Sequence, residues 1–234
     1  MMRVTNKYLL LLLLAGCGGN NSAISLINSL AVSTYPLRAA YLARVTNGVT
    51  LENYTAQVGT NCSGTATVVI TKPVGAPFEG NATALSITET DIATLPTCTP
   101  SVLGLNTTTY FDSNYTPLGF TVPGTTYGVM AAATALPVTV TTGASGVYGT
   151  LNLFTDSTKI VSAGTMVLSY AVTNKDSSND YVKLIATTST AGSGVVGVQT
   201  STYTIGYNSV LTPVSVATSA VTATGTLNTL FTKI

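Results

Sequence analysis

The stretch TMVLSYAVT, from Thr165 to Thr173, decides the fold class of this chain. Apolar side chains recur at every second position and place one face inward, at Met166, Leu168, Tyr170 and Val172. This period of two is typical of a half-buried β-strand. The turn cluster Asn174–Asp180 follows, and the next run has the same period, with Val182, Leu184 and Ala186 inward. The pattern predicts an antiparallel hairpin.

The same pattern continues on both sides of this hairpin. Downstream, VVGVQTSTYTI and VLTPVSVATS complete a four-strand meander joined by short polar turns. Upstream strands are expected at GTATVVIT, ALSITET, TTTYF, YTPLGFTV, YGVMA and YGTLNLF. Short strands punctuated by Gly, Pro and Asn favour an all-β, mainly antiparallel fold, either a β-sandwich or an open barrel built from meanders.

One short helix is expected near the N-terminus of this β-rich region. The stretch YPLRAAYLARVT, from Tyr35 to Thr46, has Pro36 in the first turn, and Asn47-Gly48 can end it. We expect this helix to pack against a sheet. Residues 34–234 then form one β-rich domain, or two halves with a break near 142–147.

The first residues have the composition of an export signal. Arg3 and Lys7 precede an apolar run from Tyr8 to Ala15. A membrane-spanning helix needs about 20 apolar residues, so this run is too short to span a bilayer. A basic start and a short apolar region indicate a secretory signal peptide.

The end of this signal, Leu14-Ala15-Gly16-Cys17, resembles the lipobox of bacterial lipoproteins. The resemblance implies that residues 1–16 are removed, that Cys17 is lipidated, and that residues 17–33 are a tether. In that family the residue after the Cys influences the membrane to which the lipoprotein is sorted. Gly18 at this position resembles the pattern of lipoproteins sorted to the outer membrane of Gram-negative bacteria. The expected location is therefore the cell envelope, with the lipid anchor in the outer membrane and the domain on either the periplasmic or the surface side. The remainder resembles Thr-rich envelope lipoproteins, a likeness that supplies no function.

Charged side chains are scarce, at 7% of the chain against roughly 25% in ordinary soluble domains. Removal of Arg3 and Lys7 from nine basic residues leaves seven, against eight acidic ones. Nucleic-acid binding draws its affinity from Lys and Arg, so this composition excludes nucleic acid as a partner. The expected partners are the membrane, through the lipid, and an envelope or surface protein.

With Cys17 lipidated, Cys62 and Cys98 remain and allow one disulfide in an oxidising compartment. The alternative is a metal or redox pair. The chain has no His, and a metal site usually needs four ligands, so the structural disulfide is favoured.

No residue is predicted to be catalytic, to bind a cofactor or to bind a metal. The absence of His excludes Ser-His-Asp and Cys-His arrangements. The motif Gly192–Gly197 fits G-x-G-x-x-G, but it joins two strands and no acidic residue follows it, which indicates a glycine hairpin. Glu89 and Asp91 share one face of a strand, as a carboxylate pair would, and are expected at a solvated edge. The oxygen-rich stretch from Asn174 to Asp180 lacks the spacing of an EF-hand and reads as a hairpin tip.

Three functions lead, and an enzyme and an outer-membrane barrel rank below them. The first is a membrane-anchored envelope lipoprotein with a structural or interaction role, to which exposed Tyr115 and Tyr207 at matching hairpin tips would add a binding edge. The second is a carrier for a small molecule or lipid, with a cavity lined by residues such as Val167, Tyr170, Leu184 and Val198. The third is a fibre or adhesion subunit, which requires a missing strand.

Overall fold

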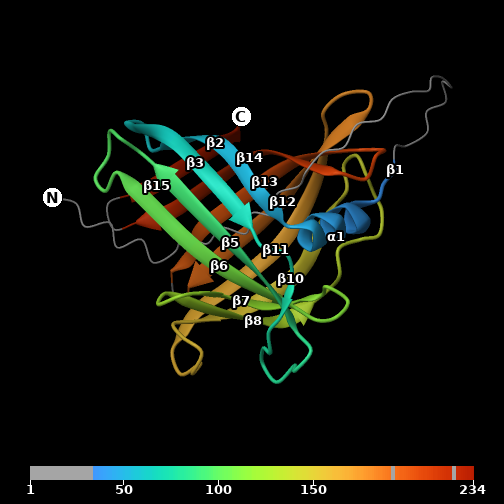
Figure 1. Ribbon diagram of the computed structural model, residues 1–234, viewed down its shortest axis with the longest axis horizontal. Helices are drawn as coiled ribbons and strands as arrows, with labels where there is room; N and C mark the ends of the chain where they lie inside the picture. Colours follow the sequence, from blue (N-terminus) through green and yellow to red (C-terminus); the bar gives the residue numbers. More distant parts are fainter. Residues whose placement is uncertain (1–33, 191–192, 223–224) are drawn as a thin grey trace.

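The computed structural model describes residues 34–190, 193–222 and 225–234, and these form a closed antiparallel barrel (Figure 1). Twelve strands pair in the ring order β3-β2-β15-β14-β13-β12-β11-β10-β8-β7-β6-β5, and β5 pairs back to β3. The prediction of an all-β, mainly antiparallel fold built from meanders is confirmed. The sheet closes on itself instead of remaining open or splitting into two layers.

The first half of the ring runs from the helix to the middle of the chain. Its strands are β2 (Val49–Val58), β3 (Cys62–Ile70), β5 (Leu85–Thr94), β6 (Val102–Phe111), β7 (Pro117–Val122) and β8 (Thr126–Ala133). The extra strand β4 (Val74–Gly75) follows β3 and pairs with the start of β5.

The second half is the long meander that the sequence predicts most directly. Its strands are β10 (Ser145–Phe154), β11 (Ser162–Asn174), β12 (Asn179–Thr190), β13 (Gly194–Gly206), β14 (Leu211–Thr222) and β15 (Gly225–Lys233). β10 pairs with both β8 and β11, so residues 142–147 lead from one half into the other within a single sheet.

Side chains alternate between the inside and the outside of the barrel, as the period of two requires. On β11, Met166, Leu168 and Val172 are buried, whereas the flanking Thr165 and Thr173 are exposed. On β12, Val182, Leu184 and Ala186 are buried, as predicted. The inner surface is therefore the core, and its inward residues decide what the barrel can hold.

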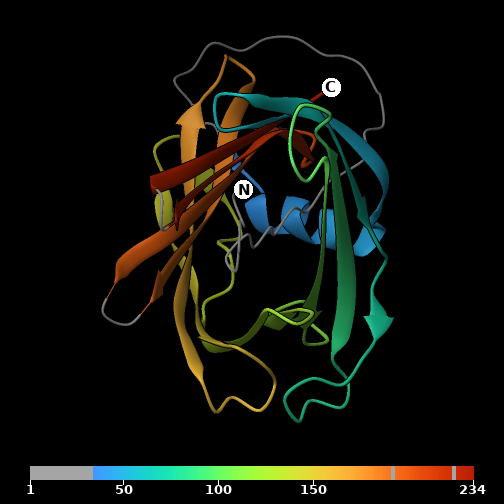
Figure 2. The ribbon, with the colours of Figure 1, turned by 90° about the vertical axis from the view of Figure 1, so that its left-hand side faces the viewer.

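The predicted helix is present as α1 (Leu37–Asn47) and lies inside the ring of strands in the end-on view (Figure 2). Gly48 ends it with φ of 65°, a value that favours glycine. Leu37 and Val45 are fully buried, and Tyr41 and Arg44 are buried with them. The helix thus packs against the inner face of the sheet.

Two contacts hold the N-terminal end of α1 and the residues before it in place. β1 (Thr34–Tyr35) pairs with β9 (Val140–Thr141) in a separate two-stranded sheet. The Arg38 Nε–H donates a hydrogen bond of 2.6 Å to the carbonyl oxygen of Leu136. Both contacts tie the start of the helix to the segment between β8 and β10.

A loop clasp lies on the outside of the barrel. Phe78, from the β4–β5 loop, stacks on Tyr110 with 4.1 Å between ring centroids. Gly119 leaves room for this ring, since a Cβ there would lie 2.7 Å from the Phe78 Cε1 atom. The next residue, Glu79, forms an ion pair with Lys159 and accepts a hydrogen bond from the Tyr127 hydroxyl at 2.6 Å. The clasp joins the β4–β5 and β10–β11 loops.

Candidate functional site

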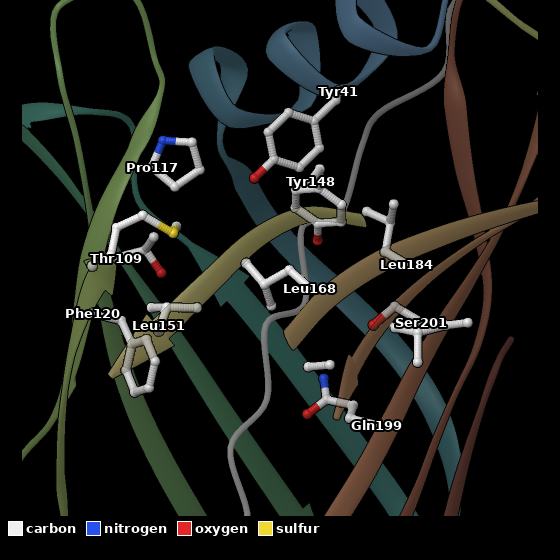
Figure 3. Close-up of a pocket in the computed structure, with 14 residues that line it drawn as sticks. Tyr41, Thr109, Pro117, Phe120, Tyr148, Leu151, Leu168, Leu184, Gln199 and Ser201 are labelled. Atoms are coloured by element: carbon white, nitrogen blue, oxygen red, sulfur yellow. The ribbon is translucent and has the colours of Figure 1, made fainter. Parts of the chain in front are cut away.

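A cavity lies inside the barrel beneath α1 (Figure 3). Most of its walls are apolar, and they come from α1 and from strands on both sides of the ring. The lining residues are Tyr41, Thr109, Pro117, Gly119, Phe120, Met130, Tyr148, Leu151, Leu168, Leu184, Ile185, Ala186, Gln199 and Ser201. Its volume is about 40 Å³. One water needs about 10–15 Å³, so the cavity has room for about three waters or one small molecule of similar size.

Three polar side chains reach this apolar space from opposite walls. Thr109 comes from β6, whereas Gln199 and Ser201 come from the inner face of β13 (Figure 3). A ligand pocket with mainly apolar walls and a few placed polar groups is the usual form of a small-molecule site. The cavity has this form.

Two tyrosines form the part of the cavity next to the helix. Burial raises the pKa of Tyr41 well above its ordinary value, and the neighbouring Tyr148 and Tyr203 raise it further. Burial likewise raises the pKa of Tyr148. Both hydroxyls therefore stay protonated at neutral pH, and the cavity gains no charge from them.

A charged cluster lies beside the cavity, around Arg44 of α1. The Arg44 Nη2 atom is 3.7 Å from Glu52 Oε2, and the guanidinium carbon is 4.8 Å from the centroid of the Tyr203 ring. Glu52 also accepts a hydrogen bond of 2.7 Å from the Tyr54 hydroxyl. Burial raises the pKa of Glu52, and Arg44 and Tyr54 act against that rise. These groups place one buried ion pair between the helix and β2.

The prediction that Glu89 and Asp91 share one face of a strand is confirmed, but the expected solvated edge is wrong. Glu89 is buried inside the barrel on β5, and neither carboxylate oxygen of Asp91 is accessible to solvent. Burial raises the pKa of Asp91 to about 7, and a side-chain interaction with Glu89 lowers it only in part. The two acids face the lumen because closure of the ring turns this face of β5 inward.

The expected carrier cavity is present with a different lining. Leu184 lines it, as predicted. Val167 and Val198 lie on the opposite faces of their strands from the lining residues Leu168 and Gln199, so they point away from the lumen. Tyr170 packs against the core without lining the cavity.

The cavity residues that sequence reasoning missed are Tyr41, Tyr148, Gln199 and Ser201. The alternation in β13 could have indicated the last two, because Gln199 and Ser201 share a face with Tyr203. Their polarity favoured the wrong face in a sequence-based assignment.

Cys62 and Cys98 are joined, with their sulfur atoms 2.01 Å apart. The bridge ties the start of β3 to the loop between β5 and β6. Cys17, the lipobox and the tether at 17–33 lie outside the described residues.

The oxygen-rich stretch after β11 is a hairpin tip, as predicted. Asp176 Oδ1 accepts hydrogen bonds from the backbone N–H groups of Ser178 and Asn179 at 2.8 and 2.9 Å. Residues 194–197 of the glycine motif Gly192–Gly197 form the start of β13, and Gly192 itself lies outside the described residues. The motif therefore belongs to a turn-and-strand segment of the meander.

The two tyrosines expected at matching tips differ. Tyr207 is 65% exposed, whereas Tyr115 is half-buried and packs against Phe111 with 6.3 Å between ring centroids. They do not form a matched exposed pair.

In residues 34–190, 193–222 and 225–234, no three His, Cys, Asp or Glu side chains come together to hold a metal ion. Within the same part of the chain, no helix has the length and apolar character needed to cross a membrane. The chain matches no protein-family model, no curated protein and no solved structure.

Proposed function

We propose that this chain is a lipid-anchored cell-envelope protein that binds a small, mainly apolar molecule inside its barrel. The observation that carries the proposal is the cavity beneath α1, which combines leucine and aromatic walls with a few polar groups. This proposal corresponds to the second of the three functions expected from the sequence, a carrier for a small molecule or lipid. It needs neither a catalytic residue nor a metal.

The arrangement of the barrel supports binding over fibre assembly. A fibre subunit of the kind considered needs a missing strand, and each of the twelve ring strands described here has a partner on both sides. The closed ring encloses apolar side chains from strands far apart in sequence, such as Phe120 and Leu184. Enclosed apolar surface is what a small apolar ligand would contact.

The anchor part of the proposal rests on Cys17 and the residues before it. Stable membrane attachment takes two or more acyl chains, which lipoprotein processing supplies. The tether of residues 17–33 would reach up to about 55 Å if fully extended, enough to hold the barrel clear of the bilayer surface.

The binding test uses the full chain carrying Cys17→Ala, which bears no acyl chains and needs no detergent. Toluene titrated by calorimetry is expected to bind. Ala186→Leu fills the cavity wall and should lower toluene affinity at least tenfold, since Ala186 is buried and lines the cavity. Ala217→Leu is the matched control, because Ala217 is exposed on β14. Equal toluene affinity in both variants, or absence of binding by toluene and by its hydroxyl and amino analogues alike, would reject the binding function.

The anchor is tested separately by membrane fractionation of cells. Wild-type protein and Ser22→Ala, which keeps the lipobox, should fractionate with membranes, whereas Cys17→Ala should leave them. Membrane association of Cys17→Ala equal to that of the wild type would reject the lipid anchor. Protease treatment of intact cells then distinguishes a surface domain, which is cut, from a periplasmic one.

A further inference from the structure

Three polar side chains form a row across the inner wall of the barrel. Gln199 on β13 is the direct cross-strand partner of Thr218 on β14, and Thr218 is the partner of Thr229 on β15. All three are buried, with 5%, 6% and 7% of their surface exposed. Each carries a buried oxygen without a hydrogen-bond partner, namely Gln199 Oε1, Thr218 Oγ1 and Thr229 Oγ1.

A buried polar atom without a hydrogen-bond partner destabilises the fold, so three in one row indicate a binding role beyond packing. The row begins at the cavity, since Gln199 lines it and Ser201, two residues along the same face, lines it too. Direct cross-strand partners have Cβ atoms about 4.5–5.5 Å apart. A single hydroxyl group placed between two such side chains can donate to one and accept from the other.

We infer that the cavity selects an uncharged molecule that carries a hydroxyl group, with that hydroxyl bound at the Gln199 end of this row. The inference rests on the proposed binding function and names its ligand class. The apolar body of the ligand lies against Leu151, Leu168 and Leu184. A hydroxyl suits Gln199 in either orientation of its amide, because it both donates and accepts.

The charges of the lumen argue for a neutral ligand. None of the residues that the structure places around the cavity is charged. Arg44 and Glu52 pair with each other, and Asp91 lies beside Glu89. A charged ligand group would have to lose its hydration without a counter-ion in the cavity wall, which is unfavourable.

Three probes of similar size separate the outcomes, each titrated against the Cys17→Ala full chain. Benzyl alcohol should bind about fivefold or more tightly than toluene, since one buried hydrogen bond contributes about that factor. Benzylamine, which is cationic at pH 7, should bind more weakly than either. This ranking needs no substitution in the cavity.

Two variants then locate the hydroxyl. Gln199→Leu should abolish the preference for benzyl alcohol while keeping toluene binding, and Thr218→Val should reduce the preference about twofold. Thr202→Val, on the outward face of β13, is the control and should change neither affinity. Toluene and benzyl alcohol binding equally would overturn the inference and leave the binding function standing. Benzylamine binding best would overturn it in favour of the Glu89–Asp91 pair. Absence of binding by all three probes would reject both proposals.

Discussion

Two walls of the same barrel lumen differ in what they do with their inward side chains. The charged wall consists of Glu52, Glu89 and Asp91 on β2 and β5, with Arg44 of α1 against it. The cavity wall consists of Leu151, Leu168, Leu184 and Gln199 on β10 to β13. Arg44 of α1 pairs with Glu52 on the first wall, and this ion pair ties α1 to β2. The second wall carries no charged side chain, and the cavity lies beside it.

The largest effect is expected from removing the cation of the charged wall. Arg44→Met should lower the free energy of unfolding by about 3–5 kcal/mol, because Glu52 is then buried without its partner. Urea unfolding at pH 7, followed by circular dichroism, measures this loss. Adding Glu52→Gln should recover part of it, since the uncompensated charge is gone. A loss under about 1 kcal/mol for Arg44→Met would mean that the ion pair does not hold the helix.

The pH dependence of the free energy of unfolding tests whether ionisation of Asp91 on the charged wall destabilises the folded state. The pKa of Asp91 is raised from 3.8 to about 7 on folding. The folded state therefore keeps a proton that the unfolded state releases, and this contribution to stability falls as pH rises from about 4 to about 7. Asp91→Asn, which cannot ionise, should be more stable than wild type at pH 8 by about 2–4 kcal/mol. The difference should shrink towards pH 4, and parallel profiles for the two proteins would contradict the assignment.

The smallest effect is expected from the ion pair on the outside of the barrel. Lys159 and Glu79 are partly exposed, and Lys159→Met should cost less than about 1 kcal/mol. Added salt should reduce even this difference, because exposed charges are screened. The measurement is the same urea titration at low and high salt. A loss as large as that of Arg44→Met would remove the distinction between buried and exposed charge.

The elements that the sequence predicts well depend on local contacts. The helix expected over Tyr35–Thr46 is found at Leu37–Asn47, where the turn at Gly48 ends it. The meander from β11 to β14 follows from alternation and short turns, because strands adjacent in sequence usually pair. Ring closure through β3–β5 and β15–β2 was beyond this reasoning, since a period of two identifies a buried face without naming the partner strand.

The inward position of Glu89 and the cavity residues on β13 were missed for a related reason, because the sequence pattern does not show which face of these strands turns inward. β5 carries apolar residues on both faces, with Ile87 buried and Ile92 45% exposed, so its pattern does not show which face receives Glu89. The pattern of β13 favours the wrong inner face, because Gln199 and Ser201 point into the lumen while Val198 points out. Alternation identifies the inner face of a strand because inner residues are usually apolar. On β13 the inner face is polar next to the cavity, so alternation pointed to the wrong face there.

The pairing of β15 with β2 has a consequence for when the barrel can form. A hydrogen bond from the Thr55 hydroxyl to the carbonyl oxygen of Thr232 joins residues 177 positions apart. During synthesis from the N-terminal end, β2 therefore keeps an open edge until β15 has been made. Contacts of such long range slow folding, and an open edge invites pairing with the wrong chain. Closure of the barrel therefore requires residues from both ends of the described chain, and β2 and β15 complete the ring together.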